Sequence, residues 1–445
     1  MGSSSAGLRL TVIGLGYLGL THAVCLAEMG HEVLAIDVDQ EKVRKAAGGE
    51  APFFEPGLEP LLCKNIDAGR LRFTSAYPAV AEFGEVHFLC VGTPPAADGA
   101  ADLRQVHAAT DALAPYLDKC SLLVGKSTVP VGTARALAER VRAAAPAGDQ
   151  VDVAWNPEFL REGHAVQDSL APDRLVFGVT SEWAAGLLGR VYEQPLRAGC
   201  PGLVMGLETA ELVKVAANAF LATKISFINA MAEMCETVDG DVVQLAEAIG
   251  YDDRIGHKCL VPGLGFGGGC LPKDIRAFSA TARKLGVTSV ADLLAEIDAI
   301  NLGRRAKVAD LVREAVGGSL AGKRVAVLGL AFKPGSDDVR DSPSLDVCAR
   351  LTREGATVSA HDPVAMANAA RVSPDLLCAP SVSAAAEGAD VVLHLTEWAD
   401  YRAIDPAALA SVVAHPIIID ARCALDAELW RAAGWTFRVP GRPTK

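Results

Sequence analysis

Arg9-Leu-Thr-Val-Ile-Gly14-Leu-Gly16-Tyr-Leu-Gly19 is the stretch of sequence that decides the fold. It opens with a short run rich in β-branched residues, passes through closely spaced glycines, and leads into an apolar-periodic segment that stops at Gly30. This order predicts a strand, a tight turn and a helix. A second predicted strand, Glu32 to Ile36, follows and ends directly before Asp37.

The glycine pattern in this context predicts a dinucleotide site. Gly14, Gly16 and Gly19 let the backbone approach a pyrophosphate at the amino end of the helix, and Asp37 can accept hydrogen bonds from a ribose 2′-hydroxyl. The Asp37 carboxylate also repels a 2′-phosphate, so NAD is favoured over NADP. The alternative is a glycine turn that serves only packing.

The remaining sequence divides into three parts by its periodicity. Strand-like runs first alternate with helix-length segments, a long helical pattern follows from about Glu208, and strand signals then return. Alternation of this kind predicts parallel sheets covered by helices. We expect an α/β protein in which a long central helical segment joins two Rossmann-like parallel-sheet domains. The expected domains are residues 1–203, 204–318 and 319–445.

The individual elements are expected as follows. The further strands of the first domain are Val86 to Val91, Leu122 to Gly125, Val151 to Trp155 and Leu175 to Val179. The helical segment covers Ala210 to Glu236, Val242 to Ile249 and Ile275 to about Val316. The last strands are Arg324 to Leu328, Thr357 to Ala360, Val391 to Leu395 and Ile417 to Ile419.

Composition excludes several classes of protein. The 445 residues carry 54 Asp and Glu against 42 Lys and Arg, a formal charge of −12, which disfavours a nucleic-acid partner but allows an anionic small molecule. The longest uncharged stretch, Leu10 to Ala27, is interrupted by glycines and makes a poor membrane span. We find no signal-peptide pattern, and Met1 to Ala6 is expected to be a loose tail.

Cysteine usage indicates a reducing compartment, so we expect a cytoplasmic protein. The 11 cysteines include no C-x-x-C pair and no Cys/His cluster of metal-binding spacing, and we expect no metal. Most of them, such as Cys25, Cys90, Cys235 and Cys348, lie in apolar surroundings typical of core residues.

Cys270 differs from the other cysteines because it ends a glycine-rich run, Val261-Pro-Gly-Leu-Gly-Phe-Gly-Gly-Gly-Cys270. Such a run forbids regular structure and leaves backbone N–H groups available to a ligand. Lys273 can stabilise a thiolate there, and Asp274 can move protons. These residues favour a nucleophilic cysteine, and the alternative is a flexible loop with an incidental thiol.

Two further segments are candidates for chemistry. Lys214 and Asn218 share one face of a predicted helix, where they can donate to an oxyanion, although such a pair is usually a solvated surface. Glu158 and Thr128 each follow a predicted strand, at the edge where open parallel sheets bind ligands, and plain loop capping is the alternative.

Taken together, these motifs resemble the nucleotide-sugar dehydrogenases, most closely the UDP-glucose 6-dehydrogenases, over nearly the whole chain. The matching segments are Gly14 to Gly19, Val91-Gly-Thr93-Pro, Lys126-Ser-Thr128-Val-Pro-Val-Gly, Asn156-Pro-Glu158-Phe-Leu-Arg-Glu162-Gly, Glu211-Leu-Val-Lys214-Val-Ala-Ala-Asn218, Arg254-Ile-Gly, Gly265-Phe-Gly-Gly-Gly-Cys270-Leu-Pro-Lys-Asp274 and Phe332-Lys333-Pro-x-x-Asp-Asp-x-Arg340-x-Ser-Pro.

The resemblance implies an amino-terminal NAD-binding domain, a central helical segment that forms a homodimer or higher homo-oligomer, and a carboxy-terminal nucleotide-sugar domain. It also implies NAD-dependent four-electron oxidation of UDP-glucose at C6 to UDP-glucuronate. In that reaction Cys270 attacks the aldehyde to give a thiohemiacetal, a second oxidation gives a thioester, and hydrolysis releases the uronate. In many relatives the position of Arg254 reaches the neighbouring subunit's site.

The resemblance also assigns roles by position. The implied catalytic residues are Cys270, Lys214, Asn218, Asp274, Glu158 and Thr128. The implied cofactor-binding residues are Gly14, Gly16, Tyr17, Leu18, Asp37, Lys42, Thr93, Thr128, Glu162 and Arg340. The implied substrate-binding residues are Glu158, Phe159, Leu160, Lys214, Asn218, Arg254, Gly265, Phe266, Gly267, Phe332, Lys333 and Arg422.

The chain departs from the family at two places. Gly269 stands where a serine usually precedes the nucleophile, and the neighbours of Arg254 are partly replaced. GDP-mannose and thymidine-nucleotide sugars therefore remain alternative substrates for the same mechanism. A two-electron β-hydroxyacid-type dehydrogenase has no use for Cys270, and a non-catalytic nucleotide-sugar sensor has no need of the intact set of Lys214, Asn218, Cys270 and Asp274.

Overall fold

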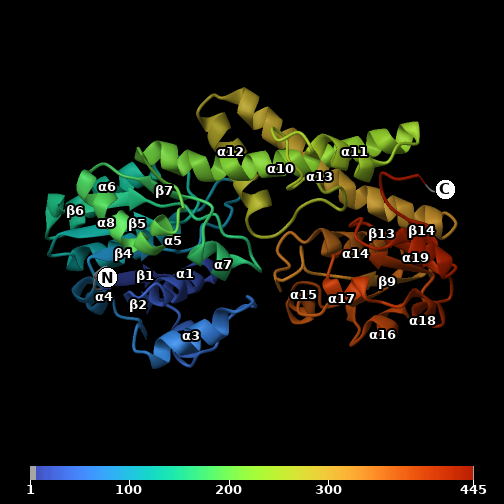
Figure 1. The fold of residues 1–445 in the computed structure, drawn as a ribbon, viewed down its shortest axis with the longest axis horizontal. Helices are drawn as coiled ribbons and strands as arrows, with labels where there is room; N and C mark the ends of the chain where they lie inside the picture. The colour runs from blue at the N-terminus through green and yellow to red at the C-terminus, as the bar shows by residue number, and fades with distance from the viewer. Residues whose placement is uncertain (1–6, 444–445) are drawn as a thin grey trace. The chain divides into compact units, whose positions relative to one another are not determined.

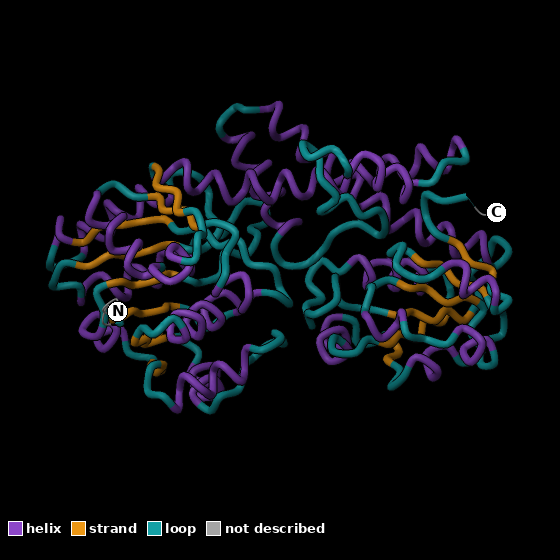
Figure 2. The backbone as a smooth tube through the Cα atoms, viewed as in Figure 1, coloured by secondary structure: helices purple, strands orange, loops and turns teal. Residues whose placement is uncertain are grey.

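The computed structural model describes residues 7–443 and divides into two compact units, one ending at Ala217 and the other starting at Asn218. Each unit contains one sheet with helices around it (Figures 1 and 2). Residues Met1 to Ala6, expected to be a loose tail, lie outside the described residues. The two sheets confirm the expected α/β class.

The first unit is built on an eight-stranded sheet of order β3-β2-β1-β4-β5-β6-β7-β8. Its strands are β1 (Arg9–Ile13), β2 (Glu32–Ile36), β3 (Leu71–Thr74), β4 (Val86–Leu89), β5 (Ser121–Gly125), β6 (Val151–Trp155), β7 (Leu175–Gly178) and β8 (Gly202–Met205). Its helices are α1 (Tyr17–Glu28), α2 (Gln40–Ala47), α3 (Leu58–Asp67), α4 (Tyr77–Phe83), α5 (Arg104–Leu113), α6 (Thr133–Ala144), α7 (Ala165–Leu170), α8 (Glu182–Val191) and α9 (Glu193–Arg197), with short 3₁₀ turns at Ala114–Tyr116 and Gly148–Gln150.

Alternation along the strands places apolar residues on both faces of this sheet. Val12 of β1 packs in a core with α1, α3 and α8, whereas its neighbour Ile13 packs in another with α4, α5 and α6. A parallel sheet buried on both faces needs such continuous apolar strands. The sheet is parallel except at one place, because β6 and β7 pair antiparallel at Trp155 and Gly178. The expectation of a Rossmann-like parallel-sheet domain is confirmed, with this antiparallel pair as an exception.

The turn after β1 has the conformation that its glycines allow. Gly14 adopts a φ of +102° and donates to the carbonyl of Ile36 at 2.7 Å. Gly19 faces it in the first turn of α1, where a Cβ atom would lie 1.8 Å from the carbonyl oxygen of Gly14. Since the obstructing atom belongs to the backbone, this close approach requires glycine.

We expect Gly19→Ala to destabilise the first unit by about 3 kcal/mol, because the added methyl forces the strand and helix apart. For a unit of this size the loss lowers Tm by about 6 °C or more, measured by thermal unfolding. Gly16→Ala is the matched control: a Cβ at Gly16 meets nothing within 4 Å, so its Tm should stay unchanged. Equal Tm values for the two variants would contradict this account.

The second unit repeats the same plan in a six-stranded, wholly parallel sheet of order β11-β10-β9-β12-β13-β14. Its strands are β9 (Arg324–Leu328), β10 (Thr357–His361), β11 (Leu377–Cys378), β12 (Val391–His394), β13 (Ile417–Asp420) and β14 (Thr436–Arg438). Helices α13 (Thr288–Ala315), α14 and α15 pack on one face, and α16 to α19 pack on the other. The helices of this sheet are α14 (Pro343–Arg353), α15 (Met366–Val372), α16 (Val382–Ala386), α17 (Ala399–Arg402), α18 (Pro406–Ala410) and α19 (Ala427–Ala432).

The turn after β9 also repeats the turn after β1. Gly329 has a φ of +104° and donates to the carbonyl of His361 at 2.8 Å, as Gly14 does to Ile36. An acid again follows the second strand, but this acid is fully buried. Asp362 accepts the backbone N–H groups of Leu330 and Ala331 at 2.8 and 3.0 Å. Two further backbone N–H groups, of Val364 and Ala365, and the indole N–H of Trp398 complete its contacts.

The predicted helical segment consists of α10 (Leu207–Val238), α11 (Val242–Gly250), α12 (Leu271–Lys284) and α13 (Thr288–Ala315). The expected single run from Ile275 to Val316 is interrupted, because Gly286 adopts a φ of +76° between α12 and α13. By length and composition alone α10 could cross a membrane, but core helices of soluble proteins pass the same test. Ala222, Ile228 and Ala232 of α10 are indeed fully buried among protein side chains.

Candidate functional site

The glycine turn of the first unit leaves space for a ligand at the amino end of α1. Gly16 is exposed and caps that helix with extended backbone, and no protein atom occupies the position of its missing Cβ. The Asp37 carboxylate accepts the backbone N–H of Leu15 at 2.7 Å and lies 4.0 Å from Lys42. Unpaired helical N–H groups, an open approach and an acid at the next strand end fit a dinucleotide.

A residue that the sequence did not reveal, Glu55, ties this turn to the loop that carries Glu162. Glu55 is 6% exposed and accepts the hydroxyl of Tyr17 and the backbone N–H groups of Gly163 and Ala165, the latter two at 2.7 Å. Burial and the neighbouring Glu55 raise the pKa of Tyr17, so its hydroxyl stays protonated and donates. Glu55 thus holds two predicted cofactor segments together, although its own sequence surroundings carry no motif.

The loops after β4 and β5 meet beside the glycine turn. Thr93 is buried and donates through its hydroxyl to the carbonyl of Thr128 at 2.9 Å, while Ser127 donates to the carbonyl of Val91 at 2.6 Å. Thr128 itself is half-buried. The structure therefore brings the two predicted threonines together at the carboxyl edge of the sheet.

Glu158 and Lys214 form a buried ion pair. Their oxygen and nitrogen lie 2.8 Å apart, and the side chains are only 12% and 6% exposed. Burial alone would raise the pKa of Glu158, but Lys214 and the backbone N–H of Leu160 outweigh it and hold the pKa below its usual value. The solvated-surface alternative for Lys214 is thereby wrong, and so is plain loop capping as a full description of Glu158. Next to them, Phe159 lies between Arg174 and Lys214, with ring distances of 3.7 and 5.8 Å.

A second glutamate, Glu211, fixes the start of the helix that carries Lys214. It is buried and accepts the backbone N–H groups of Gly132 and Ala134, both at 2.7 Å, at the amino end of α6. Burial raises the pKa of Glu211, partly offset by these N–H groups. Because Glu211 lies on α10 one turn before Lys214, it sets the height of Lys214 above the sheet.

In the second unit Cys270 is exposed at the amino end of α12, at the end of a largely buried glycine loop. The loop is held by amide side chains: Asn301 bonds both the N–H and the carbonyl of Phe266 at 2.7 and 3.0 Å, and Asn229 accepts the N–H of Gly263 at 2.9 Å. The loop is therefore ordered, and the accessible thiol expected from the sequence is confirmed. The alternative of a flexible loop does not fit these bonds.

Asp274, one turn after Cys270, forms a buried polar group with two neighbours. Its carboxylate is 1% exposed, accepts the side-chain N–H of Asn218 at 2.6 Å, and lies 2.7 Å from the ammonium of Lys273. Asn218 is itself 7% exposed, so it also does not belong to a solvated face. Asn218 follows Lys214 by one turn of α10.

The loops of the second sheet surround the glycine loop with the remaining predicted residues. Arg422 donates to the carbonyls of Leu395, Gly265 and Phe332 at 2.6, 3.0 and 3.1 Å, so it clamps three loops together. Lys333 lies 5.5 Å from the ring of the half-buried Phe332. A Cβ on Gly267 would lie 2.4 Å from the carbonyl oxygen of Asp341, so this loop packs against the 332–341 segment.

Gly269, the departure next to the nucleophile, makes room for Arg340. A Cβ at position 269 would lie 2.3 Å from Cζ of Arg340, whose guanidinium also pairs with Asp338 at 2.6 Å. The arginine therefore fills the space into which a serine side chain would project. Arg254, by contrast, lies on the surface and pairs with Asp252 at 2.6 Å.

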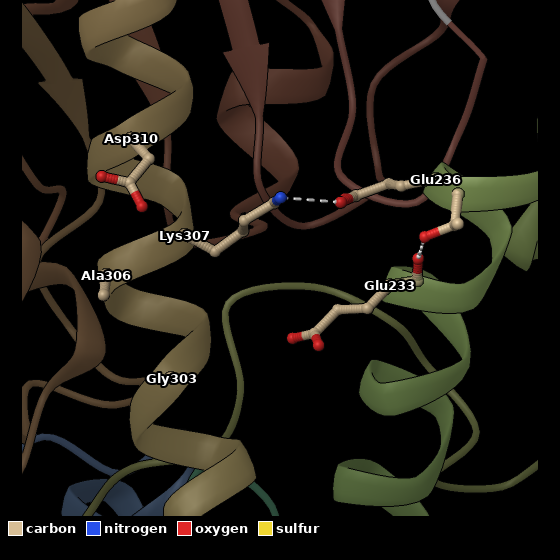
Figure 3. Close-up of a pocket in the computed structure, with 7 residues that line it drawn as sticks. Glu233, Glu236, Gly303, Ala306, Lys307 and Asp310 are labelled. Atoms are coloured by element: carbon tan, nitrogen blue, oxygen red, sulfur yellow. Dashed lines mark hydrogen bonds and ion pairs between the residues drawn. The ribbon is translucent and has the colours of Figure 1, made fainter.

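A hollow of about 550 Å³ lies between α10 and α13, apart from all of these residues (Figure 3). Its lining includes Glu233, Glu236 and Asp310, with Lys307 paired to Glu236 at 3.0 Å. None of the predicted site residues lines it. Within residues 7–443 we find no cluster of three or more His, Cys, Asp or Glu side chains suited to a metal ion.

The fold and these two clusters define an enzyme class, the NAD-dependent dehydrogenases, with a dinucleotide turn in one unit and an accessible thiol in the other. The chain belongs to the UDP-glucose/GDP-mannose dehydrogenase family. The NAD-binding, central and UDP-binding domains of that family match residues 8–196, 208–302 and 326–427.

Characterised relatives resemble the chain over almost all of its length. It is 40% identical to the UDP-glucose 6-dehydrogenase TuaD of Bacillus subtilis, covering 98% of this chain and 93% of that protein. It is 41% identical to the UDP-glucose 6-dehydrogenase of Pseudomonas aeruginosa, covering 98% of both chains. A UDP-glucose dehydrogenase structure from Pyrobaculum islandicum matches with a TM-score of 0.91 and 37% identity over 99% of both chains.

Because the cofactor is NAD, the carboxylate of Asp37 offers a direct test of cofactor choice. We expect Asp37→Asn to lower the preference for NAD over NADP, as the ratio of kcat/KM values, about tenfold or more, since the repulsion of a 2′-phosphate disappears. Asp39→Asn is the matched control, because the side chain of Asp39 caps α2, asparagine caps equally well, and the backbone N–H that Asp39 donates to Asp37 at 2.9 Å is retained. An unaltered preference in Asp37→Asn would show that other residues select the cofactor.

Proposed function

We propose that this protein oxidises the C6 alcohol of UDP-glucose to UDP-glucuronate, with two NAD molecules used per sugar. The observation that carries the proposal is the exposed Cys270 at the end of an ordered glycine loop, beside the buried Asn218–Asp274 pair. The names of relatives about 40% identical over 98% of the chain support UDP-glucose over other nucleotide sugars.

Two hydrides must leave C6 in succession, the first of which converts the alcohol into the aldehyde, and NAD supplies the acceptor when bound, one molecule for each hydride. The side chains of Lys214 and Asn218 donate to the sugar oxygen as it develops negative charge. Cys270 adds its thiolate to the aldehyde carbon: a C–S bond forms, the π bond of the carbonyl breaks and its electron pair moves to the oxygen, and the hydrogen already on that tetrahedral carbon can now leave as a hydride. Loss of that hydride leaves a thioester.

Hydrolysis then regenerates the thiol. Glu158 is ionised, so it can take a proton from water as that water attacks the thioester carbon, while Asp274 and Thr128 position the water. The C–S bond breaks, the thiolate of Cys270 takes up a proton, and the carboxylate product leaves. The sum is one sugar alcohol, two NAD and one water converted into one carboxylate, two NADH and protons.

The stoichiometry of NADH tests this proposal. With limiting UDP-glucose and excess NAD, absorbance followed to completion should give two NADH per sugar. One NADH per sugar would contradict the four-electron reaction. No NADH with UDP-glucose, but two with GDP-mannose or a thymidine-nucleotide glucose, would replace the substrate and keep the mechanism.

We also propose that the chain acts in the cytoplasm as a homodimer or higher homo-oligomer formed through α10. That helix exposes Phe220, Phe227, Met234 and Val238 by 66%, 48%, 55% and 67%, at spacings that follow one helical stripe. Sedimentation equilibrium of the purified protein tests the assembly. A monomer at micromolar concentration would contradict it.

A further inference from the structure

Lys126 is a buried lysine that the proposed chemistry leaves without a role. It follows β5, is 5% exposed, and donates to the side-chain oxygen of Asn156 at 2.9 Å and to its carbonyl at 3.3 Å. The hydroxyl of Tyr192 lies 3.4 Å from the ammonium. The rings of Phe88 and Tyr192 lie 6.0 and 5.8 Å from it, measured to their centroids.

The charge of Lys126 lacks a direct counter-ion. Across residues 7–443, no carboxylate lies within 4.0 Å of its ammonium, whereas an unpaired buried charge is costly. Burial lowers the pKa of Lys126 to about 8, with Lys214 acting in the same direction, while Cys90 and Glu158 oppose the shift. Among the groups that shift the pKa of Lys126, Glu158 is therefore the one carboxylate.

Lys126 is also joined to Glu158 through the backbone. Asn156 stands two residues before Glu158, and its N–H donates to the carbonyl of Gly125 at 2.8 Å. The side chain of Asn156 donates to the carbonyl of Val176 at 2.9 Å and accepts from both Lys126 and Tyr192. These bonds, together with the fixed φ of the proline at position 157, restrain the turn that carries Glu158.

We propose that Lys126 is a positioning residue for Glu158, which fixes the turn from Asn156 to Glu158 and adds a second buried positive charge that keeps Glu158 ionised beside Lys214. The inference rests on the role proposed above for Glu158 as the base in thioester hydrolysis. It explains why a buried lysine stands at this strand end, where an apolar residue would cost less to bury.

The other titratable groups that face Lys126 do not carry charge near neutral pH. Burial raises the pKa of Cys90 to about 12 and that of Tyr192 well above its usual value, and burial with Lys126 lowers that of His22. These groups come from α1, the end of β4 and the end of α8. The charged set is therefore Lys126, Lys214 and Glu158, and removal of either lysine should raise the pKa of Glu158.

The test is the pH dependence of acyl-enzyme decay. A single turnover of the full-length enzyme with UDP-glucose and NAD is quenched at intervals, and the acyl group on Cys270 is quantified by mass spectrometry of the intact protein. In Lys126→Met the carboxylate protonates at higher pH, so we expect the acid limb of the decay rate to move up by about one pH unit. NADH per sugar should remain two.

Tyr192→Phe is the matched control, because it removes a hydrogen bond to Asn156 but keeps the charge of Lys126, and its acid limb should not move. Should Lys126→Met fail to fold, Asn156→Asp replaces it: this isosteric change places a negative charge beside Lys126 and should move the limb in the same direction. A rate lowered equally at every pH, with the limb unmoved in both variants, would overturn the inference.

Glu158→Gln separates this inference from the proposed function. If Glu158→Gln abolishes acyl-enzyme decay and Lys126→Met leaves the limb in place, only the role of Lys126 fails. If Glu158→Gln decays at the rate of the unmodified enzyme, the role of Glu158 fails and the inference falls with it. If Lys126 acts on acyl-enzyme decay through Glu158, adding Lys126→Met to the Glu158→Gln variant should lower the remaining decay rate by less than about twofold.

Discussion

Cys270→Ala should form no UDP-glucuronate and at most one NADH per UDP-glucose. Without the thiolate the aldehyde cannot become a thioester, so we expect formation of the uronate to fall by at least about 10³-fold. The loop is held by Asn301 and Asn229, so the variant should fold and still bind nucleotide sugar. Product analysis by chromatography, together with NADH absorbance, measures the loss.

Cys378→Ala is the control for this experiment, because Cys378 is also an exposed thiol of the second unit but lies on the edge strand β11. It should retain the normal yield of uronate. Uronate formed by Cys270→Ala at the normal rate would rule out the thioester route, whatever the relatives do.

Lys214→Met should lower kcat by about 10² to 10³-fold, the usual cost of removing one donor to an oxyanion. It also strands the carboxylate of Glu158 in a buried site, and breaking a buried pair in this way costs about 3–5 kcal/mol of stability. The pKa of Glu158, now held low, should rise. Because protonation of Glu158 then removes the unpaired charge, the loss of stability relative to the unmodified protein should be largest above the raised pKa of Glu158 and should shrink as pH falls through that pKa.

Two further variants separate the loss of stability in Lys214→Met from its loss of catalytic rate. Combining Lys214→Met with Glu158→Gln leaves no unpaired charge, so it should recover most of the lost Tm but none of the lost kcat. Lys307→Met breaks a Lys–Glu pair of similar length that is more exposed, and it should change Tm and kcat little. Recovery of kcat in the double variant would contradict a direct role for Lys214.

Local signals allowed much of this structure to be predicted from the sequence. The turn from Gly14 to Gly19 and the acid at Asp37 are read within one strand–helix unit, and a cysteine after a run of glycines is conspicuous by itself. The edge strands β3, β8, β11 and β14 were not predicted. They are short and partly exposed, so they do not need the apolar runs by which buried strands are recognised.

Contacts between residues that are distant in the sequence could not be predicted, for a different reason. The contact of Glu158 with Lys214 joins an end of β6 to α10, and those of Glu55 join α1 to the loop before α7. Each depends on how strands and helices pack, which no local pattern records. The same holds for Lys126, whose burial follows from its place at the end of a central strand.

The second sheet keeps the glycine turn and the acid of the first but uses the acid differently. Asp362 already receives five hydrogen bonds from its own loops, so it has no capacity for a ribose, whereas Asp37 remains partly open. Of the two related turns, one is therefore left to receive a dinucleotide. If both oxidations use that single dinucleotide site, they must be consecutive, and the first NADH must dissociate before the second NAD binds. The half-oxidised sugar must wait through this exchange, and a covalent tether to the enzyme would keep a reactive aldehyde from escaping meanwhile.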